Sequence, residues 1–172
     1  GSGATFVART LDREIKHLGE IVRKCNDHRG TSFVDIYQNC NIYNDGAFFD
    51  LTDKETKADT QLVLENGQPM LYGADSSKGI KFNGSKLESV NIGSDYSIDD
   101  ILVHDETNKS LAFYLSEITL VPDLPTPIGV LYREEKPTYD DMMVEQIDQA
   151  IKTKGQGDLK ELLNTGHTWK VS

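Results

Sequence analysis

The residues best suited to chemistry lie in one run of the sequence, Tyr37-Gln38-Asn39-Cys40-Asn41-Ile42-Tyr43-Asn44-Asp45-Gly46-Ala47. Cys40 stands here among amide and carboxyl side chains rather than in an apolar stretch. This setting suits a thiolate ligand of a metal or cluster, because N–H groups near the sulfur stabilise its charge. A free cysteine is more often a small buried hydrophobic residue, so a purely structural Cys40 remains an open alternative.

Three other groups invite a chemical interpretation, and ordinary structural roles account for each. Asn44-Asp45-Gly46 is most simply a tight turn, although carboxylate and carbonyl oxygens such as those of its side chains also suit Mg²⁺. Cys25 falls on an apolar helical stripe and is expected in the core. His104-Asp105-Glu106 could form a metal or acid–base cluster, but adjacent residues point in different directions. Its acidic members are expected near a helix N-terminus, which favours negative charge.

Composition and absent motifs exclude several classes of function. The sequence has no Gly-x-Ser-x-Gly, P-loop or Gly-x-Gly-x-x-Gly motif. Its 172 residues carry a net charge of -10, which argues against nucleic acid or an anionic membrane as partner. No run approaches the roughly 18 apolar residues of a membrane helix, and no signal peptide opens the chain. We expect a cytoplasmic protein without a disulfide framework.

The elements that must position Cys40 read as strand, helix, strand. Residues 4–9 predict a buried strand, and residues 32–38 predict a second. Between them a helix is predicted, capped by Thr10 or Asp12 and ended by Gly30, with one buried face: Leu11, Ile15, Leu18, Val22 and Cys25. Such a unit has parallel strands, so Cys40 is expected past the carboxyl end of a strand, where α/β sheets present ligands.

The sequence after residue 50 predicts smaller elements. Residues 50–60 are charged and predict a mobile or interface loop, and residues 61–72 predict a hairpin around Asn66-Gly67. Residues 78–92 predict another strand pair. A helix is predicted over 107–118, capped by Thr107, with Leu111, Leu115 and Ile118 on one face, and a strand is predicted over 128–132.

The last part of the sequence predicts two more helices. The first runs from a capping box at Thr138 to Gly155 and has one apolar face: Met143, Ile147, Ala150 and Ile151. The second is short and covers 158–163.

Several runs closely resemble the beta subunit of 2-oxoacid:ferredoxin oxidoreductases, in the 2-oxoglutarate form. The resemblance lies, in order, in residues 4–9, 30–48, 102–106 and 127–130, and Gln38-Asn39-Cys40-Asn41 is its most specific part. It implies an α/β fold. Residues 1–49 would end a thiamine diphosphate-binding domain with its closing βαβ portion, and residues 50–172 would form an α+β extension of hairpins and helices.

The resemblance also implies a reaction, cofactors and partners. Such enzymes decarboxylate a 2-oxoacid oxidatively with coenzyme A and an alpha subunit, using thiamine diphosphate and Mg²⁺, and pass electrons through a [4Fe–4S] cluster to ferredoxin. Cys40 matches the last of the four cluster cysteines. The other three cysteines and the family's Gly-Asp-Gly…Asn motif are missing. We therefore expect a C-terminal fragment that is inactive alone and holds neither cofactor.

Two rival hypotheses remain. In the first, the chain is a docking module for the alpha subunit or ferredoxin, without chemistry of its own. In the second, it comes from a non-redox thiamine enzyme or a structural relative, and Cys40 is a plain core thiol.

Overall fold

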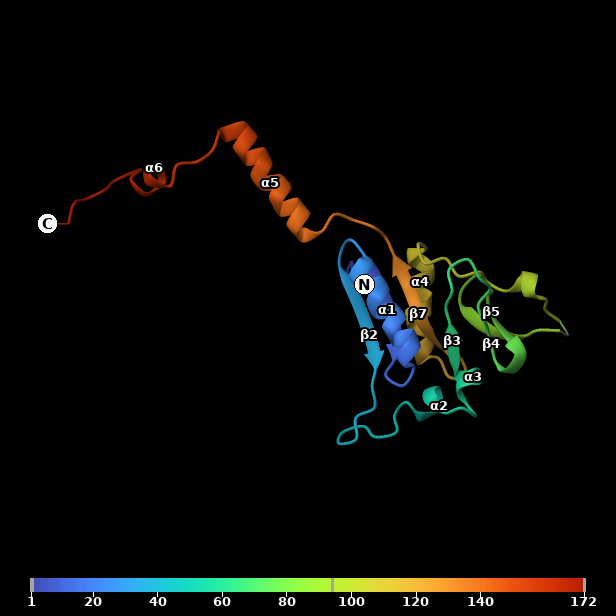
Figure 1. Ribbon diagram of the computed structural model, residues 1–172. Coiled ribbons are helices and arrows are strands. Elements are labelled where there is room, and N and C mark those ends of the chain that lie inside the picture. Colours follow the sequence, from blue (N-terminus) through green and yellow to red (C-terminus); the bar gives the residue numbers. More distant parts are fainter. Residues whose placement is uncertain (1, 94, 172) are drawn as a thin grey trace. The chain divides into compact units, whose positions relative to one another are not determined.

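The computed structural model describes residues 2–93 and 95–171 (Figure 1). Contacts between residues divide the chain into two compact units, Gly1–Lys136 and Pro137–Ser172, which are treated separately below. The domain boundary expected between residues 49 and 50 stays a prediction. No helix within the described residues is long and apolar enough to cross a membrane.

The first unit is built on a four-stranded sheet in the order β2-β1-β7-β3. Strand β1 (Phe6–Leu11) pairs in parallel with β2 (Ser32–Tyr37) and antiparallel with β7 (Thr126–Arg133). Strand β3 (Gln61–Val63) closes the other edge, parallel to β7. The predicted α/β class and the parallel strand–helix–strand unit are both confirmed.

Helix α1 (Ile15–Asp27) connects β1 to β2, and Ile21 packs with Phe6, Ala8 and Val130. The predicted buried stripe is only partly right, because Ile15 is 77% and Val22 50% exposed. The reason is the length of β1: it continues through Leu11, which pairs with Tyr37, so the helix begins later than expected.

The predicted cap of α1 is wrong. The helix begins after Glu14, which makes no side-chain capping bond. Thr10 instead bonds His17 through its hydroxyl, at 2.8 Å from Nδ1. Asp12 accepts a hydrogen bond from the backbone of Asn39. Both candidates are therefore used for tertiary contacts.

A larger core lies between the main sheet, helix α4 (Lys109–Glu117) and a second, three-stranded sheet. The second sheet is antiparallel and consists of β4 (Leu71–Tyr72), β5 (Lys78–Phe82) and β6 (Leu87–Asn91). The buried residues of this core are Leu62, Leu64, Met70, Tyr72, Ile80, Leu87, Leu111, Leu115, Ile118 and Leu131. The strand pair predicted over residues 78–92 is confirmed.

The hairpin predicted over residues 61–72 is wrong. Strand β3 bonds β7, and β4 bonds β5, so the two apolar runs around Asn66-Gly67 pair with distant strands instead of with each other. The loop predicted over 50–60 is also wrong. This region contains the short helices α2 (Phe49–Thr52) and α3 (Lys57–Thr60), joined by hydroxyl bonds from Thr56 and Thr60 to the Asp50 carbonyl.

Helix α4 buries Leu111 and Leu115, and Ile118 directly after it is buried as well, as the sequence pattern predicts. Its cap is Asn108 rather than Thr107, because the Asn108 side chain accepts a bond from the Leu111 amide. Short 3₁₀ turns complete the unit: η1 (Ala74–Ser76), η2 (Ile98–Asp100) and η3 (Ile118–Leu120).

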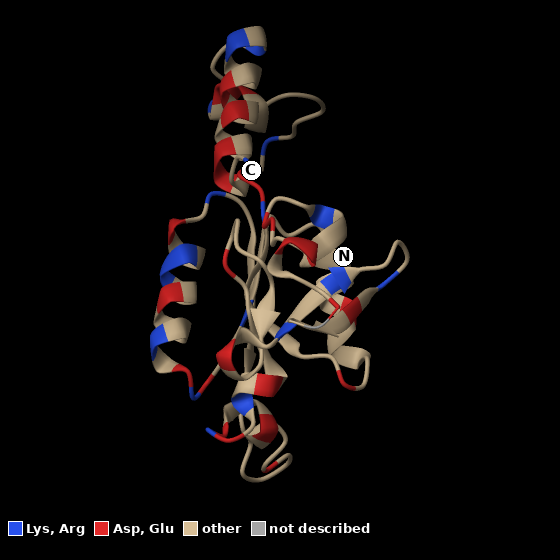
Figure 2. Cartoon of the chain, turned by 90° about the vertical axis from the view of Figure 1, so that its right-hand side faces the viewer, with Lys and Arg blue, Asp and Glu red and all other residues tan. Residues whose placement is uncertain are grey.

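The second unit holds helix α5 (Tyr139–Lys154) and the short α6 (Leu159–Leu163). The capping box of Thr138 and Asp141 and the end of α5 at Gly155 are confirmed. Every described residue from 137 to 171 is at least partly exposed, including the predicted apolar face of α5. Figure 2 shows both signs of charge along α1 and α5.

Candidate metal centre at Cys40

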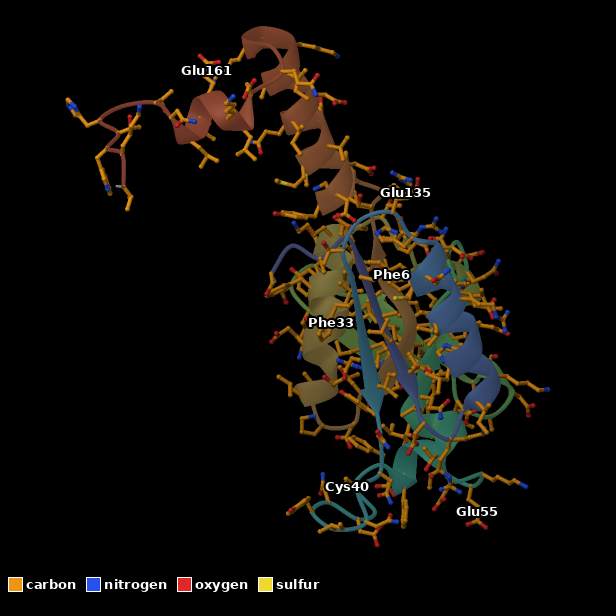
Figure 3. The ribbon with its side chains drawn as sticks, turned by 60° about the vertical axis from the view of Figure 1, so that its left-hand side comes forward. Phe6, Phe33, Cys40, Glu55, Glu135 and Glu161 are labelled. Atoms are coloured by element: carbon orange, nitrogen blue, oxygen red, sulfur yellow. The ribbon has the colours of Figure 1, made fainter. Side chains whose placement is uncertain are left out.

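Cys40 lies in the loop beyond the end of β2, as Figure 3 shows. The loop turns back at once, because the Asn44 amide donates to the Cys40 carbonyl at 3.0 Å and these two residues form an isolated bridge. The thiol is free and half-buried. The parallel strand–helix–strand unit thus presents Cys40 at the edge of the sheet where the sequence predicts it.

The backbone of the turn lowers the pKa of the Cys40 thiol. The amides of Tyr43 and Ile42, with a smaller effect from Asn44, hold the pKa of the Cys40 thiol below its usual value. Partial burial and the nearby Asp45 carboxylate act in the opposite direction. A sulfur that accepts N–H bonds is a better thiolate, and such bonds also tune the potential of a cluster.

An aromatic stack closes the base of the loop. The Tyr37 and Phe48 rings stack with centroids 4.7 Å apart. Arg9 lies over the Tyr37 ring, with its guanidinium carbon 4.9 Å from the ring centroid. Its Nε donates to Asp35 Oδ2 at 3.0 Å. These contacts tie the end of β2 at Tyr37 to Phe48, the residue just before α2.

One thiolate does not make a cluster site. A four-iron cluster takes four cysteine ligands, and the sequence has only Cys25 besides Cys40. Cys25 packs against the core of α1 and the sheet. The described residues contain no group of three or more His, Cys, Asp or Glu that could hold a metal ion. Cys40 therefore offers a single thiolate.

The other residues with chemical potential have structural partners. His104 is 1% exposed, and its Nε2 donates to the Val130 carbonyl at 2.8 Å. Burial lowers the pKa of His104. Asp105 instead accepts bonds from the Thr107 amide and hydroxyl. His104 and Asp105 thus serve different local structures, which favours the non-catalytic interpretation of this segment.

Sequence reasoning missed two features of this unit. The first is the role of Asp12 and Asn39 in shaping the loop, for which the amide-rich composition around Cys40 was the available signal. The second is a cavity of about 640 Å³ between the sheet and α4, lined by Val7, Phe33, Lys109, Phe113, Leu131 and other residues. Phe33 lies there on β2, beside α4 (Figure 3). No local sequence pattern announces a cavity that elements distant along the chain enclose.

Comparison with solved structures identifies the class of fold. The chain matches a 2-oxoglutarate:ferredoxin oxidoreductase from Magnetococcus marinus, solved with 2-oxoglutarate, coenzyme A and succinyl-CoA bound, with a TM-score of 0.54. The match covers 96% of this chain and 42% of that chain, at 18% sequence identity. The fold of this chain is therefore part of the α/β fold of such an oxidoreductase.

Sequence comparison is more specific. The chain is 34% identical, over 99% of its length, to 2-oxoglutarate oxidoreductase subunit KorB from Mycobacterium tuberculosis, and it spans 46% of that relative. A stretch of 44 residues, 26% of this chain and 14% of the relative, is 48% identical to a 2-oxoacid:ferredoxin oxidoreductase beta subunit from Saccharolobus solfataricus. No protein-family model matches the chain. The chain belongs to the beta subunits of 2-oxoacid:ferredoxin oxidoreductases, as the resemblance indicated.

Proposed function

We propose that this chain works in the oxidative decarboxylation of a 2-oxoacid, 2-oxoglutarate in the first place, to its coenzyme A thioester with ferredoxin as electron acceptor. The printed names of KorB and of the Magnetococcus enzyme support the substrate, and the bound molecules of that structure support coenzyme A. The beta-subunit relationship supports an alpha subunit as partner. Because the chain spans less than half of these relatives, we propose the reaction for the assembled enzyme, in the cytoplasm, and expect no turnover from the chain alone.

The observation that carries the proposal is the place of Cys40 in the loop just past the end of β2, where the parallel strand–helix–strand unit presents it. In the assembled enzyme Cys40 would supply one thiolate to a [4Fe–4S] cluster, which carries electrons when bound. The N–H groups of Ile42 and Tyr43 would offset its negative charge. Thiamine diphosphate and Mg²⁺, which support the decarboxylation when bound, would be held by residues outside this chain.

The proposal is tested by Cys40→Ser in a full-length beta subunit that contains this sequence, with Cys25→Ser as the matched control. Both proteins are assembled with the alpha subunit, and their iron content, visible spectrum and ferredoxin reduction are measured. We expect Cys25→Ser to keep the cluster, because that thiol packs in the core, and Cys40→Ser to lose it.

Two outcomes would contradict the proposal. A Cys40→Ser enzyme with normal cluster content and ferredoxin reduction would favour a docking module or a non-redox relative. The second is a stable four-iron spectrum on the 172-residue chain alone after anaerobic iron–sulfide reconstitution. It would show that the cluster does not need further cysteine ligands from outside this chain.

A further inference from the structure

Helix α5 carries an apolar face that lies exposed. Met143, Ile147 and Ile151 follow one another at intervals of about one turn, and between 37% and 53% of each is exposed. A helix of 16 residues is marginal in water on its own, because most of the stability of such helices comes from packing an amphipathic face. The apolar face of α5 therefore needs a partner surface.

This face ends in opposite charges. Residues seven apart lie almost on one line of a helix, and Asp140, Ile147 and Lys154 form such a series. Asp140 lies in the first turn of α5 and Lys154 in its last turn, and both are exposed. We call the resulting line of side chains the α5 stripe, and its members in order are Asp140, Met143, Val144, Ile147, Ala150, Ile151 and Lys154. The stripe is acidic at its start, apolar in its middle and basic at its end.

The α5 stripe is symmetric about Ile147 in everything except the sign of its end charges. Residues 143–144 precede Ile147 by four and three positions, and residues 150–151 follow it by three and four. When a second α5 lies antiparallel with Ile147 opposite Ile147, apolar pairs face apolar pairs and Asp140 faces Lys154 at both ends. A parallel pair would place like charges opposite each other, which is unfavourable. The end charges therefore favour an antiparallel second copy as the partner.

The other charges of α5 lie off the stripe. At about 100° per residue, Asp141, Glu145, Asp148 and Lys152 fall on the opposite half of the helix, where they stay in water. Figure 2 shows that acidic residues occupy the first part of α5 and basic residues its end. The whole chain has a net charge of -10, so two copies repel each other unless opposite charges meet. An antiparallel pair of α5 helices brings opposite charges together at both ends.

We propose that the α5 stripe is a self-association surface. Two copies of the chain pair through it, antiparallel, about a twofold axis at Ile147, with Asp140 of each copy against Lys154 of the other. This inference goes beyond the proposed function and does not depend on it. A helix of 16 residues is about 24 Å long, so the paired surface is small and its association reversible, with a dissociation constant on the order of 10–1000 µM.

The first test is sedimentation equilibrium of the 172-residue chain between about 10 µM and about 1 mM, in about 0.15 M salt. We expect a monomer–dimer equilibrium. Ile147→Glu should weaken it at least about tenfold, because it places two carboxylates at the apolar centre of the pair.

Met142→Glu is the matched control for Ile147→Glu. Met142 is 51% exposed and Ile147 53%, but Met142 lies off the stripe. Its variant should keep the dissociation constant within about threefold of the parent. A parent chain that stays monomeric up to about 1 mM would overturn the proposal, because another surface would then have to cover the stripe. Equal weakening by the two variants would overturn it as well.

The second test concerns orientation. In an antiparallel pair, Asp140→Lys places lysine against Lys154 at both ends and should weaken association about tenfold. Glu145→Lys changes the net charge equally on the opposite half of the helix and should not weaken it. In a parallel pair Asp140 would face itself, so Asp140→Lys would only exchange one repulsion for another. Association unchanged by Asp140→Lys would therefore contradict the antiparallel arrangement.

A double variant separates pairing from damage to the helix. An acid at the start of a helix and a base at its end stabilise the helix itself, so each single change can also fray α5. Asp140→Lys with Lys154→Asp frays both ends but restores opposite charges across the pair. We expect its dissociation constant to return to within about threefold of the parent. A double variant that associates more weakly than Asp140→Lys alone would assign the effect to the helix ends and overturn the proposed pairing.

Discussion

Backbone amides of Tyr43 and Ile42 hold the pKa of the Cys40 thiol below its usual value. Its lowered pKa predicts faster reaction with iodoacetamide near neutral pH than the same residue shows in the unfolded chain. The measurement is the alkylation rate of Cys40 against pH in a Cys25→Ser background, folded and in urea. We expect the midpoint of the folded profile at the lower pH. Identical midpoints would show that the turn does not act on the thiol.

The buried side chain of His104 should make the free energy of unfolding depend on pH. Burial lowers the pKa of His104, so the unfolded chain takes up a proton at a higher pH than the folded chain does. The free energy of unfolding should therefore be fully developed above the unfolded-state value of about 6.5 and decrease as the pH falls below it. The pKa values of His28 and His17 are also lowered, mainly by burial, and act in the same direction.

Urea denaturation at about pH 7.5 and about pH 5 measures this dependence. His104→Gln cannot take up the proton and should lose less stability between the two pH values than the parent. At neutral pH it should be less stable by about 1–3 kcal/mol, because the bond from Nε2 to the Val130 carbonyl is buried. A pH-dependent loss as large in the variant as in the parent would assign the effect to other groups.

At the scale of elements, the N-terminus of α4 tests where capping occurs. Asn108 accepts from the Leu111 amide at 3.0 Å, whereas Thr107 bonds only to the exposed Asp105. Asn108→Ala should cost about 1 kcal/mol of stability, as loss of an N-cap does. Thr107→Ala should cost less. Thermal or urea unfolding of the two variants distinguishes them, and the opposite order would restore the sequence-based assignment of Thr107.

Strand β7 contains a position that tolerates only glycine. Gly129 has a φ of +122°, and a Cβ there would lie 2.8 Å from the Leu64 carbonyl oxygen. Gly129→Ala should destabilise the protein by about 3 kcal/mol, through backbone strain and separation of β7 from the following chain at Leu64.

A second glycine provides a control of opposite sign. Gly19 lies inside α1, and an added Cβ meets only the end of Arg23 at 3.7 Å. Gly19→Ala should therefore stabilise by up to about 1 kcal/mol, because alanine is the better helix former. Urea denaturation measures both variants. Similar effects at the two positions would contradict the strained conformation of Gly129.

At the scale of the whole molecule, we expect the stability of the first unit not to depend on the second. Every buried residue among those described lies before residue 137, so the first unit has a hydrophobic core of its own. Deleting residues 137–172 should leave the melting temperature of the remainder unchanged within about 2 °C. Differential scanning calorimetry of both proteins measures this, and a larger drop would show that the second unit supports the first.

Local patterns predicted the elements whose partners lie nearby. The strand–helix–strand unit needs only residues 4–38, the β5–β6 pair needs only residues 78–92, and each is present as expected. The errors fall where long-range pairing decides. β7 lies between β1 and β3 in the sheet and takes β3 as a partner, so the apolar runs around Asn66-Gly67 do not form their predicted hairpin.

The sequence by itself determined the family, the α/β class and a cysteine directly after a parallel strand, because periodic apolar patterns and short motifs are local properties. The tertiary structure decided what surrounds that cysteine. The bond between Asp12 and Asn39 joins residues 27 positions apart, and the one between His104 and Val130 joins residues 26 apart. Polar groups take whichever partner the packed chain brings within about 3 Å. Neighbours in sequence do not specify these partners.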